Sequence, residues 1–181
     1  TRLWPLSRST APKQFIDFLG DKTLFQETLE RVSDQEVYHP PIILTNDGFR
    51  FLAAQQAQDV AVELSAIVLE PFGRNTAGAL AVAATIVDQM FGADALIQVM
   101  GSDYELEANQ NYRDSVAIAA REAGNGNIAI LGIQPTEPST GFGYIQAGDA
   151  TASGVNSVKR FMEKPAREQA EQMLATGGYY W

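Results

Sequence analysis

A cluster of three cations lies near the start of an otherwise acidic chain. Arg2, Arg8 and Lys13 fall within residues 1–15, a run with two prolines and no helical pattern. Over the whole chain, 13 lysines and arginines face 22 aspartates and glutamates, a formal net charge of -9. Lysine and arginine form charge-assisted hydrogen bonds with phosphate, so the cluster predicts a phosphate site. Charge alone favours the alternative, a solvated loop with scattered charges.

A carboxylate with the chemistry of a metal ligand follows an apolar segment further along the chain. Asp103 comes just after the segment that ends at Met100. Mg²⁺ prefers hard oxygen ligands and usually takes one or two carboxylates together with phosphate oxygens. Asp103 is therefore our candidate for the metal ligand. By position alone, an aspartate in a loop more often caps a turn or a helix.

A second carboxylate, Glu70, ends another apolar segment and is followed by a helical pattern that opens near Asn75. The Watson–Crick edge of guanine carries two hydrogen-bond donors, and one carboxylate can accept both of them. Glu70 therefore has the chemistry that binding of a guanine base requires. For Asn75 the alternative to a ligand contact is a helix cap.

Apolar β-rich segments alternate with stretches of helical period, which is typical of βαβ units on a parallel sheet. The strands are predicted at residues 42–45, 66–69, 95–100 and 128–133, and the helices at about 24–33, 48–58, 76–91 and 109–123. The pattern predicts an α/β fold with a Rossmann-like, mostly parallel sheet flanked by helices. Ligands of such sheets bind beyond the carboxyl ends of the strands, where residues 70–76 and 101–103 fall.

The last third of the chain has a different pattern. Strands at 143–147 and 155–162 and a helix at about 166–175 predict a small antiparallel region beside a second ligand. We find no internal repeat and no linker, so residues 1–181 are predicted to form a single domain. Because residue 1 is not methionine and residue 181 has no polar tail after it, we expect this domain to be incomplete at both ends.

Composition excludes several classes of function. The net charge of -9 disfavours binding to nucleic acid or to an anionic membrane. There is no apolar run near the roughly 20 residues of a membrane span and no secretory signal, so we expect a cytoplasmic protein. Without cysteine, and with His39 as the one histidine, thiolate catalysis, zinc-thiolate sites and most imidazole schemes are excluded.

Residues 1–15 resemble the signature of the nucleotide-sugar pyrophosphorylases, Gly-x-Gly-Thr-Arg-Leu-x-Pro-Leu followed by Pro-Lys. The segments Trp-Pro-Leu-Ser-Arg and Pro-Lys-Gln-Phe are similar in sequence to the corresponding segments of bacterial mannose-1-phosphate guanylyltransferases. The resemblance implies a glycosyltransferase-A-like nucleotidyltransferase fold, with Arg2 and Lys13 as catalytic residues that bind the triphosphate. Residues 70–77 resemble the motif Gly-Arg-Asn-Thr-Ala-Pro-Ala beside the base, although Gly78 stands in place of the proline. By that resemblance the nucleotide is bound by Glu70, Gly73, Asn75 and Thr76.

Three further motifs extend the resemblance to the whole chain. Residues 99–104 are similar to Met-Pro-Ser-Asp-His, with Gly101 and Tyr104 in place of proline and histidine. These two replacements leave undecided whether the site is catalytically active. Residues 132–145 resemble a sugar-side loop, and residues 163–165 match a Glu-Lys-Pro motif. Together they imply a sugar-phosphate site made of Gly141, Gly143, Tyr144, Glu163 and Lys164, in which Glu163 contacts hexose hydroxyls and Lys164 contacts the phosphate.

The reaction that the resemblance implies joins GTP and mannose 1-phosphate to give GDP-mannose and pyrophosphate. No protein nucleophile is required, because the sugar phosphate oxygen attacks the α-phosphorus directly. Catalysis would be positioning and charge neutralisation by Arg2, Lys13 and Mg²⁺ on Asp103, so the basic loop and Asp103 must lie close together.

Several alternatives stay open from sequence alone. They are a pyrophosphorylase for another sugar or base, and a non-catalytic nucleotide-sugar-binding homologue. We expect residues 1–181 alone to turn over poorly, since a glycine-rich opening, an asparagine after Trp181 and a second metal-binding aspartate of the family lie outside them. A C-terminal isomerase domain and a homo-oligomer are both compatible with the sequence.

Overall fold

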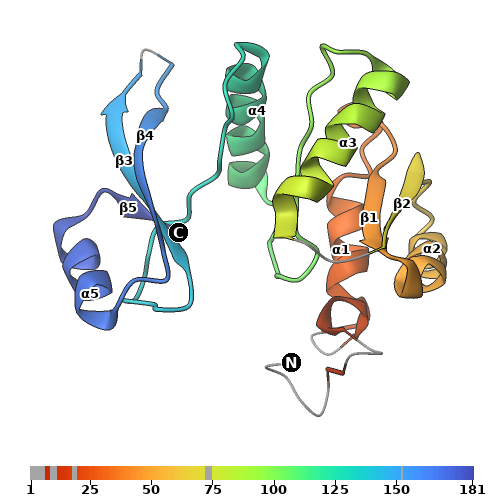
Figure 1. Cartoon of the computed structure of the whole chain (residues 1–181), viewed down its shortest axis with the longest axis horizontal. Helices are drawn as coiled ribbons and strands as arrows, with labels where there is room; N and C mark the ends of the chain where they lie inside the picture. Colours follow the sequence, from red (N-terminus) through yellow and green to blue (C-terminus); the bar gives the residue numbers. More distant parts are fainter. Residues whose placement is uncertain (1–6, 9–11, 18–19, 72–74, 152) are drawn as a thin grey trace. The chain divides into compact units, whose positions relative to one another are not determined.

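The computed structural model describes residues 7–8, 12–17, 20–71, 75–151 and 153–181 (Figure 1). The chain divides into two compact units, residues 1–114 and 115–181. Helix α4 (Gln110–Gly124) spans the division. The organisation as a single domain stays a prediction.

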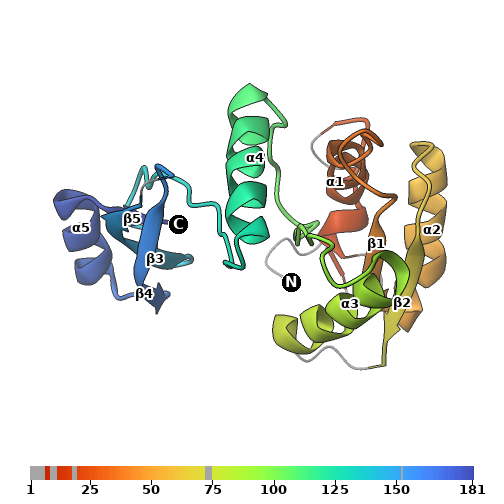
Figure 2. The ribbon, with the colours of Figure 1, turned by 90° about the horizontal axis from the view of Figure 1, so that it is seen from above.

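A parallel pair of strands lies at the centre of the first unit. β1 (Ile42–Asn46) and β2 (Ala66–Glu70) pair in register from Ile42 opposite Ala66 to Asn46 opposite Glu70. The connection between them contains the short 3₁₀ helix η2 (Asp47–Phe49) and α2 (Arg50–Asp59). Figures 1 and 2 show β1 and β2 side by side with α2 next to them. This βαβ unit confirms the predicted parallel α/β pattern and places Asn46 beside Glu70 at the carboxyl end of the pair.

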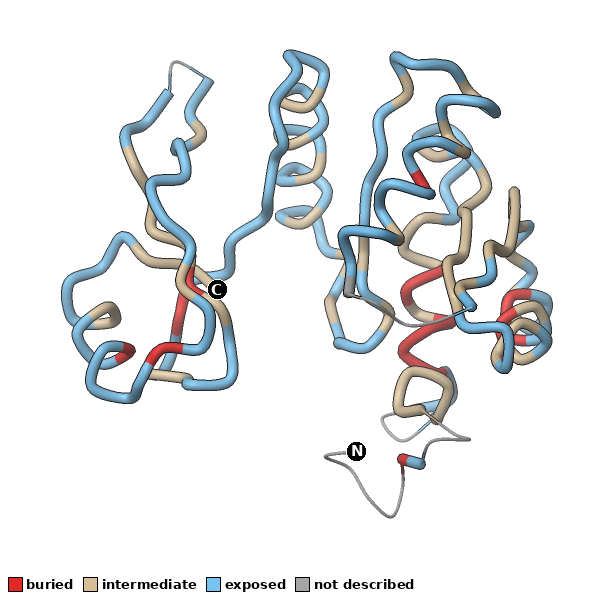
Figure 3. Tube along the Cα trace, viewed as in Figure 1, coloured by how far each residue is buried: buried red, intermediate tan, exposed pale blue. Residues whose placement is uncertain are grey.

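The apolar core of this unit lies between α1 (Leu24–Arg31) and α2. Phe25 and Leu29 of α1 pack against Ala53 and Ala57 of α2, and the small alanine side chains let the two helices approach closely. Phe15, in the 3₁₀ turn η1 (Lys13–Phe15), packs against the same cluster. Figure 3 shows these buried stretches of the first unit. The turn that contains Lys13 is thereby attached to the core through the Phe15 ring.

A capping box fixes the start of α1. The Thr23 hydroxyl accepts a hydrogen bond from the Gln26 amide at 3.2 Å, and the Gln26 side chain accepts one from the Thr23 amide at 3.0 Å. These bonds satisfy two of the amides that a helix N-terminus otherwise leaves without partners. The helix therefore begins at Leu24, as the sequence predicts.

The second unit contains an antiparallel sheet with strand order β4-β3-β5. Its strands are β3 (Gly143–Ala150), β4 (Asn156–Glu163) and β5 (Tyr179–Tyr180), and α5 (Arg167–Thr176) lies beside them (Figures 1 and 2). Gly177 ends α5 with a φ of 72°, a conformation that favours glycine. The predicted antiparallel region is confirmed, and β5 is an additional short strand.

Two of the predicted strands are not formed among the described residues. The segments 95–100 and 128–133 have no strand assignment, although both are apolar. Ile133 alone exchanges two backbone hydrogen bonds with Trp181, each 2.9 Å long. Leu96, Val99 and Ile128 are exposed. The prediction was wrong because β-branched and apolar composition shows that a segment suits a pleated surface but does not supply the partner strand.

The third predicted helix is α3 (Asn75–Phe91), which begins one residue earlier than expected. It follows β2 after a connection of residues 71–74. Within the part of the chain that the structure describes, neither α3 nor any other helix is both long and apolar enough to cross a bilayer.

Removing one buried side chain tests the core between α1 and α2. Leu29 is 2% exposed, so Leu29→Ala should lower the free energy of unfolding by about 2–5 kcal/mol through lost burial and a residual cavity. Val37→Ala is the matched control because Val37 is 66% exposed, and its effect should stay within about 0.5 kcal/mol. Urea unfolding measures both. Equal losses for the two variants would contradict this assignment of the core.

Candidate active site around Lys13, Asp103 and Glu70

The predicted site residues are divided between the two units. Lys13, Glu70, Thr76 and Asp103 belong to the first unit, and the predicted sugar-phosphate residues belong to the second. Arg2 and Gly73 lie outside the described residues, as does the side chain of Asn75. The geometry of the site therefore depends on the remaining side chains.

Lys13 and Asp103, far apart in the sequence, form an ion pair. The distance between Lys13 Nζ and Asp103 Oδ2 is 2.9 Å. The lysine side chain is 39% exposed and the aspartate side chain 56% exposed, so water and solutes reach both. Exposed ion pairs of this kind contribute only about 0–1 kcal/mol, and exchanging one partner for a ligand costs little. The predicted phosphate-binding cation and the predicted metal-binding carboxylate thus lie in direct contact.

The position of Lys13 follows from the short turn that contains it. The Phe15 amide donates to the Pro12 carbonyl at 3.0 Å, and the Ile16 amide donates to the Lys13 carbonyl at 3.2 Å. The Phe15 ring packs at centroid distances of 5.1 Å from Phe25 and 5.8 Å from Phe49. The turn is therefore held on one side by the core and presents Lys13 on the other.

The segment before Asp103 is held by side-chain hydrogen bonds. The Tyr38 hydroxyl donates to Gln98 Oε1 at 2.9 Å, and Gln98 Nε2 donates to the Tyr112 hydroxyl at 2.8 Å. Met100 Sδ accepts from Gln98 Nε2 at 3.2 Å and from the Tyr112 hydroxyl at 3.4 Å. Side-chain contacts thus hold residues 98–100 in place of the predicted ladder of backbone hydrogen bonds.

The pKa of Tyr38 lies above its ordinary value, so its hydroxyl stays protonated and remains a hydrogen-bond donor. Partial burial raises the pKa of the Tyr38 phenol, and electrostatic interactions with Tyr112 and Asp34 raise it further. The hydrogen bond from Tyr38 to Gln98 is therefore insensitive to pH around neutrality.

Gly101 and Tyr104 are spatial neighbours at Asp103. A Cβ atom on residue 101 would lie 3.1 Å from Tyr104 Cε1 and 3.4 Å from Asp103 Oδ1. Such a contact with the ring is tighter than side chains normally tolerate, so the tyrosine ring uses space that a larger residue 101 would occupy. The two departures from the Met-Pro-Ser-Asp-His pattern are therefore linked in space and lie beside the candidate metal ligand.

Glu70 lies at the carboxyl end of β2, where its neighbour Asn46 contacts its backbone. Asn46 Nδ2 donates to the Glu70 carbonyl at 3.3 Å, while Asn46 Oδ1 accepts from the Gly48 amide at 3.0 Å. Thr76 is an exposed residue in the first turn of α3, only a short connection beyond Glu70. A helix N-terminus attracts anions through its unpaired amides and its dipole. Glu70 and the first turn of α3 are neighbours along the chain, and a joint nucleotide site there stays a prediction.

The predicted sugar-phosphate residues gather at one end of the antiparallel sheet. Gly143 pairs with Glu163 across β3 and β4, and a Cβ on Gly143 would lie 2.6 Å from Phe161 Cζ. A larger residue 143 would therefore require the exposed Phe161 ring to move. Lys164 Nζ lies 2.9 Å from Glu163 Oε1, and the Lys164 amide donates to the Phe142 carbonyl at 3.2 Å.

Tyr144 and Gly141 support the same loop. The Tyr144 side chain is fully buried, and its hydroxyl donates to the Ser139 carbonyl at 3.0 Å. The Gly141 amide donates to Ser139 Oγ at 3.2 Å. In the described structure Tyr144 therefore shapes the loop from beneath, and its contact with a ligand stays a prediction.

A single Mg²⁺ carboxylate ligand fits what the described residues offer. Among them, no group of three or more histidine, aspartate and glutamate side chains is arranged to enclose a metal ion. Asp103 supplies one hard oxygen donor on an accessible side chain. This suits an ion that takes its remaining ligands from phosphate and water, as Mg²⁺ does in phosphoryl-transfer sites.

Three residues that contribute to this arrangement were not predicted. Asn46, Gln98 and Gln56 all place amide groups against backbone or side-chain atoms near the site. A signal was present for Gln98, since it interrupts the otherwise apolar segment 95–100. For Asn46 the signal was its position at the end of a predicted strand, where ligands of parallel sheets bind.

A double-mutant cycle tests the coupling between residues 101 and 104. Gly101→Ala should destabilise the protein while Tyr104 is present, because the new methyl group displaces the ring. In a Tyr104→His background the same change should cost less, giving a coupling of about 0.5–1 kcal/mol in urea unfolding. Gly78→Ala is the control, since a Cβ there meets no atom within 4 Å. Additive effects at 101 and 104 would rule out the coupling.

Comparison with known proteins connects this geometry to a family. The family described as nucleotidyl transferase matches residues 1–181. The chain is 52% identical over its full length to a mannose-1-phosphate guanylyltransferase of Sinorhizobium fredii, of which it covers 35%. It is 46% identical to the xanthan biosynthesis protein XanB of Xanthomonas campestris, of which it covers 38%. The chain thus spans little more than a third of the length of these relatives.

Solved structures agree in fold. A crystal structure described as mannose-1-phosphate geranyltransferase from Thermus thermophilus matches with a TM-score of 0.83 and 32% identity, over 99% of this chain and 51% of that one. A Helicobacter pylori structure described as mannose-6-phosphate isomerase matches with a TM-score of 0.81 and 30% identity, over 96% of this chain and 64% of that one.

Proposed function

Since this chain belongs to the nucleotidyltransferase family, we propose that it is the nucleotide-binding part of a mannose-1-phosphate guanylyltransferase. The enzyme transfers GMP from GTP to mannose 1-phosphate and gives GDP-mannose and pyrophosphate. The observation that carries the proposal is the 2.9 Å contact between Lys13 and Asp103, which joins a phosphate-binding cation to a metal-binding carboxylate. The relative of that name at 52% identity supports the choice of base and sugar.

The proposed chemistry is a direct displacement at phosphorus. An oxygen of the mannose 1-phosphate attacks the α-phosphorus of GTP, the bond from that phosphorus to the bridging oxygen of the β-phosphate breaks, and pyrophosphate leaves. Negative charge grows on the leaving oxygens, where Lys13 and Arg2 stabilise it. The Asp103 carboxylate would hold Mg²⁺, which would supply Lewis-acid neutralisation of the phosphate charge.

Glu70 is proposed to select guanine. Its carboxylate accepts from the two donors on the guanine edge, a pattern that adenine does not offer. Asn46 fixes the Glu70 backbone, and Gly73, Asn75 and Thr76 complete the nucleotide site at the start of α3. Positioning residues on the rigid end of a strand give a more exact geometry than residues on a free loop.

The sugar phosphate is proposed to bind at the end of β3 and β4. Glu163 contacts hexose hydroxyls and Lys164 contacts the phosphate, while Gly141, Gly143 and Tyr144 shape the loop. Both charged side chains are more than half exposed, so their mutual ion pair is easily replaced by a ligand. We further propose a cytoplasmic location. We also propose a use of GDP-mannose in polysaccharide synthesis, which the name of the xanthan biosynthesis relative supports. Assembly into a homo-oligomer is part of the proposal.

A second candidate function is a non-catalytic nucleotide-sugar-binding homologue. The observation that favours it is the replacement of proline and histidine by Gly101 and Tyr104 beside Asp103. Such a protein would bind GDP-mannose and release no pyrophosphate. A pyrophosphorylase for another base or sugar differs from both in its nucleotide preference.

Replacing either member of the ion pair tests the catalytic assignment. In the full-length protein, Lys13→Ala and Asp103→Asn should each lower kcat/KM by about 10²–10³, the loss typical of one group that stabilises transition-state charge. Lys22→Ala is the matched control, because Lys22 forms an exposed ion pair of the same kind with Glu30 at 2.6 Å. Pyrophosphate release measures activity, and thermal unfolding should shift little in all three. If the Lys13 and Lys22 variants behaved alike, the proposed site would be wrong.

Nucleotide competition tests the role of Glu70. The full-length protein with Mg²⁺ should bind GTP more tightly than ATP. Glu70→Gln should weaken GTP binding by about tenfold or more, the value of a lost hydrogen bond to a charged group, and leave ATP binding unchanged. Glu63→Gln, an exposed glutamate of the same unit, serves as control. Equal affinities for GTP and ATP in the unmodified protein would show that another base is used.

A further inference from the structure

Gln56 is a buried polar side chain directly beneath the turn that contains Lys13. It lies on α2 between the apolar residues of the core and is 8% exposed. A buried amide costs free energy unless its donors and acceptors are paired. An apolar side chain of equal volume would fill the same space, so packing alone does not explain why residue 56 is an amide.

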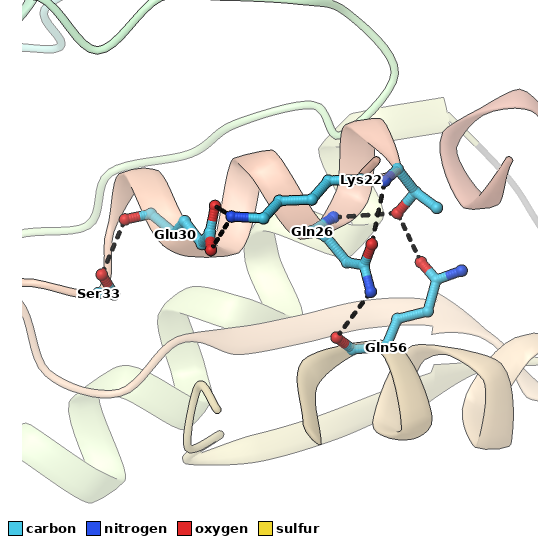
Figure 4. A network of polar contacts seen from close by, with 6 residues as sticks. Lys22, Gln26, Glu30, Ser33 and Gln56 are labelled. Atoms are coloured by element: carbon cyan, nitrogen blue, oxygen red, sulfur yellow. Dashed lines mark hydrogen bonds and ion pairs between the residues drawn. The ribbon is translucent and has the colours of Figure 1, made fainter. Parts of the chain in front are cut away.

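The hydrogen bonds of Gln56 join η1, α1 and α2, and Figure 4 shows those that involve α1. Its Oε1 accepts from the Thr23 hydroxyl at 2.7 Å, which ties α2 to the cap of α1. Its Nε2 donates to the Phe15 carbonyl at 3.1 Å, which ties α2 to η1. Its own carbonyl accepts from Gln26 Nε2 at 3.4 Å. The amide is therefore a junction between η1, α1 and α2.

Only one of these bonds acts on the Lys13 turn. The Phe15 carbonyl belongs to the last residue of η1, and Lys13 is the first residue of the same turn. Apolar packing of the Phe15 ring limits how far the turn moves but is not directional. The bond from Gln56 adds direction, because it requires the Phe15 carbonyl to point toward α2. With that carbonyl fixed, the turn presents Lys13 toward Asp103.

From this geometry we propose that Gln56 is a positioning residue for the nucleotidyl transfer. It holds the Phe15 carbonyl so that the Lys13 ammonium meets the charge that develops on the triphosphate. This proposal rests on the proposed function of the Lys13 and Asp103 site. Catalysis by positioning is sensitive to small errors, since a displacement of about 1 Å can cost about 100-fold in rate.

Gln26 is a matched control within the same network. It is buried to a similar degree and belongs to α1, and its side-chain hydrogen bonds go to Thr23 and to the Gln56 carbonyl of α2. Gln26→Met removes the bonds to Thr23 and to the Gln56 carbonyl and leaves the bond from Gln56 to Phe15. Gln56→Met removes that bond and the one from Thr23, and it keeps the volume of the side chain.

The experiment compares these two variants in the full-length protein. Hydrogen exchange of the Phe15 and Ile16 amides, which close the turn, should be faster in Gln56→Met and unchanged in Gln26→Met. In GTP turnover with Mg²⁺, Gln56→Met should lower kcat by about 10- to 100-fold with a smaller change in KM. Gln26→Met should lower the unfolding temperature and leave kcat within about twofold, because a merely structural defect does not alter the folded site.

The outcomes are distinguishable. Equal effects of Gln56→Met and Gln26→Met on kcat, or unchanged exchange of the two amides in Gln56→Met, would overturn the positioning role. If Lys13→Ala and Asp103→Asn were fully active, the proposed function itself would fail. Should Gln56→Met not fold, Gln56→Glu gives the same comparison, since it retains an acceptor for the Thr23 hydroxyl and removes the amide donor to Phe15.

Discussion

Two opposite charges, Lys13 and Asp103, must be held in contact although they are far apart in an acidic chain. An exposed ion pair is too weak to hold itself together, so the geometry has to come from the elements behind each side chain. Behind Lys13 are the aromatic packing of Phe15 and the amide of Gln56. Behind Asp103 is the chain of side-chain contacts through Gln98. The position of Lys13 thus depends on the core of the first unit, and that of Asp103 on hydrogen bonds outside this core.

Polar groups in this protein act mainly as connectors between elements. Thr23 and Gln56 link α1 with α2, Asn46 links the ends of β1 and β2, and Gln98 links a segment without a strand ladder to two tyrosines. Gln56 is the buried one of these amides, and its pairing removes most of the desolvation cost of placing it in the core. Directional contacts at these points complement apolar packing, which does not fix orientation by itself.

The amino-acid sequence predicted the parallel pairing of β1 and β2 because two apolar runs flank a helical segment, the pattern of a βαβ unit. It also predicted that Lys13 and Asp103 lie together, since the motifs that contain them must meet one triphosphate. It did not predict the absence of strand pairing at residues 95–100, because apolar composition contains no information on the partner. The bonds of Gln56 to Thr23 and Phe15 span 33 and 41 residues and leave no local signal.

The exposed contact between Lys13 and Asp103 has a consequence for the order of events at the site. While Lys13 and Asp103 are paired, each neutralises the charge of the other, which weakens the attraction of an anion to the lysine or of a divalent cation to the aspartate. In the proposed function, a triphosphate bound to the lysine would free the carboxylate for a cation, and a bound cation would free the lysine. Binding of nucleotide and metal would then be linked reciprocally through one solvent-accessible salt bridge.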